Sequence, residues 1–265
     1  MILRCKGSDF FFIEKKAPQL VRHRFLSRIF NHWKKSYFMK TTYLGHSCIL
    51  METMGKTILF DPFISGNPLA KAIDIDSLNP DYILVSHAHM DHVLDLERIA
   101  EKSKAKIVSN YEIFSYYNAK GFDGHPLNHG GKASFDFGTV KYVNAVHSSV
   151  FPDGTYGGNP GGFVIWNEEA CVYFAGDTAL TMDMKLIPMT CPAVDLAILP
   201  IGDNFTMDGE EALLAADFVQ CDKIMACHYD TFEPIQIENK EELKKLFSDK
   251  GKTLLLPSVG ESIKS

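Results

Sequence analysis

The densest group of potential metal ligands in the sequence is His87, His89, Asp91 and His92, all within one stretch of six residues. Histidine nitrogen and carboxylate oxygen are donors suited to zinc, manganese or iron, and packing does not explain four of them in so short a segment. Because alternate residues of an extended turn point the same way, His87 and His89 are placed to share one ion while Asp91 and His92 face a second. The alternative interpretation is a polar surface loop or a helix N-cap, which suits a single histidine better than this group.

This segment follows Tyr82–Val85, a short apolar run preceded by Pro80 and Asp81. Such a run predicts a buried strand, so the ligands come off the carboxyl end of that strand. Loops at the carboxyl ends of strands are where sheets of the α/β type place their chemistry. Three more residues with metal-binding side chains follow apolar runs that predict strands, and they are His147, Asp177 and His228.

Taken in order, these motifs resemble the pattern of the metallo-β-lactamase superfamily: H-x-H-x-D-H, a further His, an Asp in a Gly-Asp pair and a last His. The resemblance implies an α/β (α+β) fold, a single-domain αββα sandwich of four layers with a binuclear metal site along one edge of its paired sheets. It assigns His87, His89 and His147 to one ion, Asp91, His92 and His228 to the other, and Asp177 to a bridge between them. The implied cofactors are two divalent metal ions, with zinc expected first and manganese or iron as alternatives.

Shorter motifs narrow the resemblance to a branch of metal-dependent hydrolases. That branch is similar to the bacterial lactonase that opens L-ascorbate 6-phosphate and, more remotely, to the phospholipase D that acts on N-acylated phosphatidylethanolamine. The motifs are Tyr43–Ser47, Leu59–Phe63, Gly157–Pro160, Ile201–Met207 and His228–Phe232. This chain departs from the branch at Phe174, where histidine is common, and at Asp208, where glycine is common, and neither change removes an expected ligand.

Four residues are expected around the metal ions or the substrate: His46, Asp61, Asn204 and Thr231. By resemblance, Asp61 supports a metal-bound histidine and fixes its tautomer and ring angle. The alternative for Asp61 is a turn aspartate before a proline. His46 either faces the site or is a structural histidine of a turn, and Thr231 is expected to line the pocket.

The implied catalytic residues are Asp91 and Asp177. Two cations about 3.5–4 Å apart share one water and lower its pKa from about 15.7 toward neutrality, which gives a hydroxide nucleophile at physiological pH. Asp91 is expected to take the proton or to hold the hydroxide.

The resemblance therefore predicts an enzyme, a metal-dependent hydrolase of a small ester, lactone or phosphodiester, with a sugar-phosphate lactone preferred. A phosphodiesterase that acts on a nucleotide or a phospholipid is the nearest alternative. A second alternative is a di-iron protein that reduces oxygen or nitric oxide, although that branch typically has Glu where this chain has His89. A third is a metal-binding protein without catalysis.

Composition restricts the partners and the compartment. The chain has 265 residues, 46% of them hydrophobic, and a net charge of −6, so it is long enough to bury a full core. Residues 1–38 carry a net charge of +7 and the remainder −13. The acidic charge of residues 39–265 argues against nucleic acid as a partner and leaves a small anionic substrate as the expected one. The sequence has no apolar run long enough to span a membrane. Six cysteines without C-x-x-C spacing favour free thiols in a reducing cytoplasm. Relatives often form homo-oligomers, which is expected here too.

The chain divides into a basic extension at residues 1–38 and a hydrolase domain at 39–265. We expect the extension to be a translated leader that is disordered or loosely helical, while a membrane-surface or partner-binding arm and a targeting segment are the alternatives. In the domain, His125 and His129 are expected at the surface or in a turn, away from the metals. Strands are expected at 42–44, 48–51, 57–60, 82–85, 106–108, 133–137, 140–145, 163–166, 171–174, 195–199 and 223–226, and helices near 93–100, 112–117, 208–219 and after Asn239.

Overall fold

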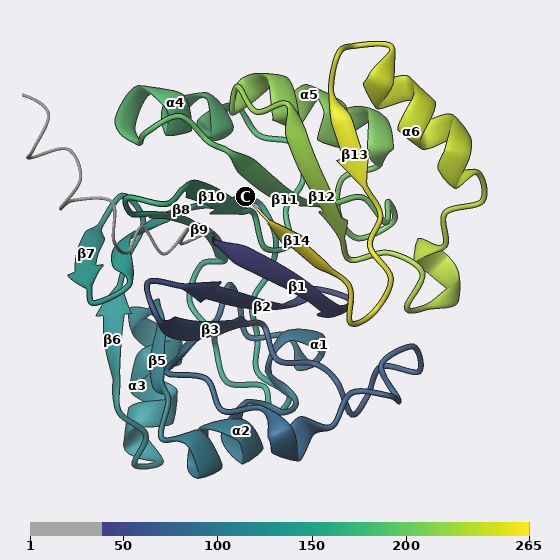
Figure 1. The fold of residues 1–265 in the computed structure, drawn as a ribbon. Coiled ribbons are helices and arrows are strands. Elements are labelled where there is room, and N and C mark those ends of the chain that lie inside the picture. The colour runs from purple at the N-terminus through teal and green to yellow at the C-terminus, as the bar shows by residue number, and fades with distance from the viewer. Residues whose placement is uncertain (1–38, 265) are drawn as a thin grey trace, which may run out of the picture. The chain divides into compact units, whose positions relative to one another are not determined.

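The computed structural model describes residues 39–264, which contain fourteen strands in two seven-stranded sheets. The basic extension, with its expected helix near residues 20–35, lies outside the described residues. Figure 1 shows the two sheets packed face to face in the middle of the described part of the chain.

The first sheet has the order β14-β1-β2-β3-β4-β5-β6. The pairs from β14 to β3 are antiparallel, and those from β3 to β6 are parallel. Its strands are β1 (Lys40–Gly45), β2 (Cys48–Thr53), β3 (Lys56–Phe60), β4 (Tyr82–Leu84), β5 (Lys106–Asn110), β6 (Gly124–Leu127) and β14 (Ser262–Lys264).

The second sheet has the order β13-β12-β11-β10-β9-β8-β7. The pairs among β10, β11, β12 and β13 are parallel, and those from β7 to β10 are antiparallel. Its strands are β7 (Lys132–Phe135), β8 (Gly138–Asn144), β9 (Gly161–Trp166), β10 (Cys171–Phe174), β11 (Leu196–Pro200), β12 (Lys223–Cys227) and β13 (Thr253–Leu255).

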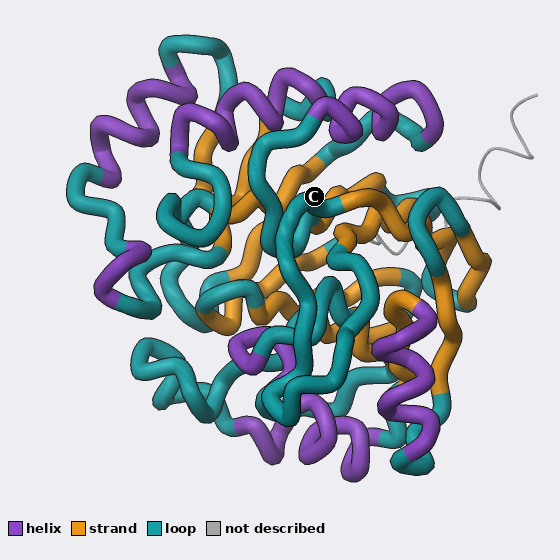
Figure 2. Tube along the Cα trace, turned by 180° about the vertical axis from the view of Figure 1, so that it is seen from behind, coloured by secondary structure: helices purple, strands orange, loops and turns teal. Residues whose placement is uncertain are grey.

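Helices cover the outer face of each sheet, which completes an αββα sandwich (Figures 1 and 2). On the first sheet these are α1 (Met90–Val93), α2 (Leu96–Ser103) and α3 (Tyr111–Ala119), and on the second α4 (Ile187–Thr190), α5 (Gly209–Phe218) and α6 (Lys240–Ser248). Short 3-10 helices lie at Ile75–Ser77, Met182–Leu186 and Glu233–Ile235. Within residues 39–264, none of the helices has the length and apolar character needed to cross a membrane.

Strand β4 shows why the chain forms layers. Tyr82 and Leu84 belong to the larger apolar core, between the sheets. Ile83 and Val85 belong to a second core that includes residues of α2 and α3. Successive side chains of a strand point to opposite faces, so a continuous apolar run buries both faces of the sheet. The apolar runs of the sequence are thus the central strands of the sandwich.

Helix caps lie where the sequence places them. The Asp208 carboxylate accepts a hydrogen bond from the backbone N–H of Glu211 at 2.8 Å, and the Asn239 side chain accepts one from Glu242 at 3.1 Å. These bonds satisfy donors that the first turn of a helix leaves without partners, which fixes the starts of α5 and α6. Asp208 is therefore an N-cap.

Three strands, β6, β13 and β14, were not expected from the sequence. Gly124–Leu127, expected as a turn, is the edge strand β6, where Gly124 allows the close approach of Ile107 and an edge position tolerates Pro126. The last strand, β14, was not expected from the sequence because it is short, exposed and pairs with β1 from the other end of the domain. All five cysteines in the described range are free, and four of them are buried.

The fold gathers the expected metal ligands at one edge of the sandwich. β8, β10 and β12 run in the same direction, so the chain leaves all three on one side, toward His147, Asp177 and His228 respectively. β4 delivers His87 to the same edge. His228 has a φ of 54°, a left-handed conformation that costs energy for a residue with a side chain and often marks functional sites.

Candidate metal centre

The first cluster consists of His87, His89 and His147. One ring nitrogen from each lies within 4.8 Å of the others, close enough to share one cation. The Nε2 atom of His87 lies 3.0 Å from Nδ1 of His89. His87 is fully buried, while His89 and His147 reach partly into solvent and line a pocket.

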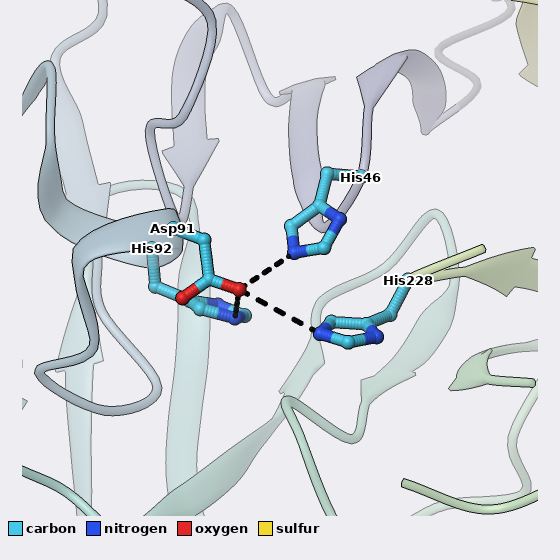
Figure 3. Close-up of side chains that lie close together, drawn as sticks. All are labelled: His46, Asp91, His92 and His228. Atoms are coloured by element: carbon cyan, nitrogen blue, oxygen red, sulfur yellow. Dashed lines mark hydrogen bonds and ion pairs between the residues drawn. The ribbon is translucent and has the colours of Figure 1, made fainter. Parts of the chain in front are cut away.

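The second cluster consists of Asp91, His92, His228 and His46, whose ligand atoms likewise lie within 4.8 Å of one another. Figure 3 shows the three imidazole rings converging on one carboxylate oxygen, Oδ2 of Asp91. That oxygen is 3.0 Å from Nε2 of His46 and 3.8 Å from Nε2 of both His92 and His228. His46 was expected around the site, and in the structure it directly contacts Asp91, an expected ligand.

Asp177 lies between the two clusters. Its Oδ2 atom is 2.9 Å from Nε2 of His228 and 3.2 Å from Nε2 of His92, both in the second cluster. The same oxygen is 3.7 Å from Nε2 of His147 and 3.9 Å from Nε2 of His87, both in the first. One buried carboxylate thus reaches both clusters.

Buried polar atoms without partners test whether these residues fit metal ions. Oδ1 of Asp177, Nε2 of His92 and Nδ1 of His228 are buried and have no hydrogen-bond partner in the described structure. Buried polar atoms in native proteins are almost always satisfied, and one of these three, Nε2 of His92, faces Oδ2 of Asp177 at 3.2 Å. Imidazole and carboxylate donors are the set that zinc, manganese and iron accept, so the residues fit a pair of divalent cations.

Asp61 fixes the orientation of two of the histidines. It is fully buried and accepts hydrogen bonds from Nδ1 of His92 at 2.8 Å, from the Ser86 hydroxyl at 2.5 Å and from the Ser86 backbone N–H at 2.8 Å. Because the Ser86 hydroxyl donates to Asp61, its oxygen accepts from Nδ1 of His87, 2.9 Å away. Both rings therefore carry a proton on Nδ1, and Nε2 is the atom that faces the clusters. Ser86 was missed in the sequence, although it directly precedes His87.

His46 is buried and held on three sides. Its Nδ1 atom lies 3.0 Å from the hydroxyl of Thr231, and its ring packs edge-on against Phe63 and Phe232. Burial and the positive charge on His228 lower the pKa of His46 to about 4. The ionised Asp91 carboxylate can only accept, so a neutral His46 carries its hydrogen on Nε2 and donates it to Asp91, and its Nδ1 atom faces the Thr231 hydroxyl without a hydrogen.

The two clusters differ in charge. Burial and the neighbouring histidines lower the pKa of each histidine in the first cluster, so these rings are neutral at pH 7. In the second cluster, burial is outweighed by nearby carboxylates, which raise the pKa of His92 well above its usual value and that of His228 to about 9. Burial alone would raise the pKa of Asp91 and of Asp177, but the neighbouring histidines hold both well below their usual values.

A pocket of about 580 Å³ opens onto both clusters. Its lining contains five residues of the two clusters and the bridge, together with Met90, Ser148, Val150, Phe151, Pro152 and Phe205. Ser148 extends the polar part, since its hydroxyl lies 3.2 Å from Nε2 of His89.

Other predicted residues lie away from this pocket. Asn204 was expected near the substrate, but it is exposed and does not line the pocket, and its neighbour Phe205 does. His125 packs edge-on against Phe135, outside both clusters, as expected. His129 likewise lies outside them and forms a hydrogen bond of 2.8 Å with the carbonyl of Pro160.

Comparisons with known proteins agree with this geometry. A family model described as the beta-lactamase superfamily domain matches residues 40–228. The chain is 63% identical over 225 residues to a UPF0173 metal-dependent hydrolase of Flavobacterium johnsoniae, with 85% of this chain and 99% of that protein covered. It is 44% identical over 230 residues to a UPF0173 metal-dependent hydrolase of Bacillus cereus, with the same coverage.

A solved structure shares both fold and sequence. Igni18, a metallo hydrolase from Ignicoccus hospitalis, superposes with a TM-score of 0.78 at 34% identity, covering 86% of this chain and 98% of that one. A sequence identity of 34% is higher than that of proteins which share only a fold. The chain therefore belongs to the beta-lactamase superfamily and, within it, to the UPF0173 metal-dependent hydrolases.

Proposed function

We propose that this protein binds two divalent metal ions at the two clusters and hydrolyses a small carboxylic ester or lactone. The observation that carries the proposal is the position of Asp177, whose Oδ2 atom lies within 3.9 Å of histidine nitrogens from both clusters. The unpartnered Oδ1 of the same carboxylate supports it.

In this proposal the first cluster would hold one ion, Asp91, His92 and His228 would hold the other, and Asp177 lies where its carboxylate could reach both. Zinc is the first expectation, with manganese or iron as alternatives, because all three accept imidazole and carboxylate donors. When bound, two such cations lower the pKa of a shared water toward neutrality and polarise the oxygen of the bond under attack.

The protein's own residues orient the reactants. Asp91 lines the pocket as an ionised carboxylate, so it accepts a hydrogen bond from a water molecule there and directs that water toward the substrate. His46 donates to the same Oδ2 atom and holds the carboxylate in place. Asp61 and Ser86 hold the Nδ1 atoms of His92 and His87, so that Nε2 of each ring is the atom that faces the clusters. The apolar side chains around the pocket limit the entry of other water.

Metal analysis beside a substrate panel tests this function. We expect about two metal ions per chain, turnover of simple esters or lactones, and loss of both in Asp177→Ala. Asp195→Ala is the control, because Asp195 accepts a hydrogen bond from the Cys171 backbone and does not line the pocket. A phosphodiester in the same panel tests the nearest alternative. Metal-free wild-type protein after growth and purification with added zinc, manganese and iron would contradict the proposal.

A further inference from the structure

The pocket over the two clusters is polar at its floor and apolar at its walls. The polar lining comes from Ser148, Asp177 and four cluster residues, His89, Asp91, His147 and His228, and the apolar walls are Met90, Val150, Phe151, Pro152 and Phe205. No lysine or arginine of the described residues lines this pocket. Phosphate and sulfate groups are usually recognised by Arg or Lys side chains, so a phosphorylated substrate finds no cationic side chain here.

Three of the wall residues expose much of their apolar surface. The exposed fractions are 55% for Phe205, 51% for Met90 and 43% for Val150. Single exposed apolar residues are ordinary, but here three of them surround the opening above one site. Apolar surface left in water is a source of binding free energy for a ligand that covers it.

Phe205 is held at the opening by a constrained turn. Asp203 and Asn204, the two residues before it, have φ values of 58° and 41°, which non-glycine residues rarely adopt. The turn is closed by a hydrogen bond from the Asp203 N–H to the Met207 carbonyl at 3.0 Å, and the Met207 N–H binds the carbonyl of Thr178 at 3.1 Å. Thr178 follows the bridging aspartate, so the position of Phe205 is tied to the floor of the site. Strained backbone persists where the surrounding structure fixes it, often at functional sites.

The part of the wall around Phe151 is also preformed. The ring of Phe151 stacks on that of Tyr116 in α3, with centroids 3.7 Å apart and planes within 16°. The Tyr116 hydroxyl donates to Asp153 at 2.9 Å, and the Phe151 N–H binds the carbonyl of Thr155 at 2.8 Å. The pocket therefore offers an apolar slot of fixed shape beside the expected metal ions.

We infer that the substrate carries an uncharged, apolar acyl chain or alkyl-substituted ring next to the bond that is cleaved. The inference rests on the proposed function and departs from the small anionic substrate, such as a sugar-phosphate lactone, that the sequence resemblance favours. The acyl chain or alkyl group of the substrate lies between Phe205 and Val150–Phe151. The carbonyl carbon of the bond that is cleaved faces Asp91 and Asp177.

Kinetic assays with substrates of increasing alkyl length test the apolar slot. Metal-loaded protein is assayed with p-nitrophenyl acetate, butyrate, hexanoate and octanoate, with γ-lactones of increasing alkyl length, and with a phosphorylated sugar lactone. Burial of one methylene is worth about 0.8 kcal/mol, so kcat/KM rises roughly fourfold per added methylene until the slot is full. The phosphorylated lactone is the poorest lactone substrate.

Substitutions of Phe205 test whether this wall residue causes the dependence of kcat/KM on chain length. Phe205→Ala flattens the dependence of kcat/KM on chain length, and Phe205→Lys raises the relative rate on the phosphorylated lactone. Leu186→Ala is the matched control, because Leu186 has an exposed fraction of 53%, close to that of Phe205, and lies outside the pocket. A steep chain-length dependence that survives in Phe205→Ala would overturn the assignment.

A binding measurement separates this inference from the proposed function. Calorimetric titration of metal-loaded protein with acetate, butyrate, hexanoate and octanoate is expected to show affinity that increases with chain length, and less so in Phe205→Ala. Absence of turnover on all carbonyl substrates together with this binding trend overturns the proposed hydrolysis and leaves the apolar slot standing. Turnover with no preference for longer chains, or with preference for the phosphorylated lactone, overturns the inference and leaves the hydrolase standing.

Discussion

Asp61 is expected to control metal affinity without contacting a metal ion. Its buried carboxylate accepts from the Ser86 N–H, the Ser86 hydroxyl and Nδ1 of His92. In Asp61→Asn the side chain keeps its size and one acceptor oxygen, but an NH₂ group replaces the other oxygen. When the amide oxygen keeps the bond from the Ser86 N–H, the NH₂ group stands in the place of Oδ2 and cannot accept the hydrogen of His92 Nδ1, so the ring orientation that points Nε2 at the cluster is no longer favoured.

The expected magnitude follows from these contacts. Loss of a carboxylate that orients a metal-bound histidine typically costs about 10–100-fold in metal affinity. One buried donor left without a partner costs about 1–3 kcal/mol, so the free energy of unfolding of the metal-free variant falls by about that amount. Asp61→Ala leaves at least two donors unpaired, and its loss is about twice as large.

Asp95 provides a matched control. It is also buried and accepts from two backbone N–H groups, of Ile64 and Ser65, and from the Ser65 hydroxyl, yet none of these donors is a histidine. Asp95→Asn is expected to lose stability to a similar extent and to keep wild-type metal affinity. The assays are chemical denaturation of the metal-free proteins and zinc competition with a chromophoric chelator. Equal losses of zinc affinity in the two variants would refute the role given to Asp61.

Two further predictions follow from the pKa shifts and from the helix caps. The second cluster must release protons to bind a cation, because the raised pKa values of His92 and of His228, about 9, keep both protonated at pH 7. The affinity of the second cluster for a cation therefore rises about tenfold per pH unit for each proton released, as the pH increases toward 9. The affinity of the first cluster changes little, because its histidines are already neutral. Chelator competition at pH 6.5 and 8.5 distinguishes the two ions, and equal slopes for both would contradict this. Separately, Asp208→Ala removes the cap on the Glu211 N–H and lowers the free energy of unfolding by about 0.5–2 kcal/mol, measured by denaturation, with wild-type metal content retained.

Local patterns in the sequence account for the central strands, the caps and the expected ligand set. Apolar runs such as Tyr82–Val85 predict strands buried on both faces, and a strand end tells where a polar side chain emerges. Asp208 and Asn239 cap their helices through groups three residues away, so no distant contact is needed to predict them. The chemistry of the ligands is likewise carried by residue type and close spacing.

Contacts between distant segments are decided only by the tertiary structure. β14 pairs with β1 through residues such as Thr42 and Ser262, which lie 220 positions apart, and nothing local in a three-residue exposed strand signals that partner. Gly124–Leu127 becomes a strand because β5 offers it an edge, whereas its glycine and proline by themselves favour a turn.

The same distinction holds within the site. The sequence by itself showed that histidine and aspartate lie at the ends of predicted strands, and the resemblance to the superfamily implied which of them meet. It did not determine that His46 would touch Asp91, that Ser86 would link two rings to Asp61, or that Phe205 rather than Asn204 would line the pocket. Those outcomes depend on the direction of single side chains, which backbone angles and packing against distant elements set. Only the tertiary structure could therefore decide the apolar walls, and with them the class of substrate that we infer.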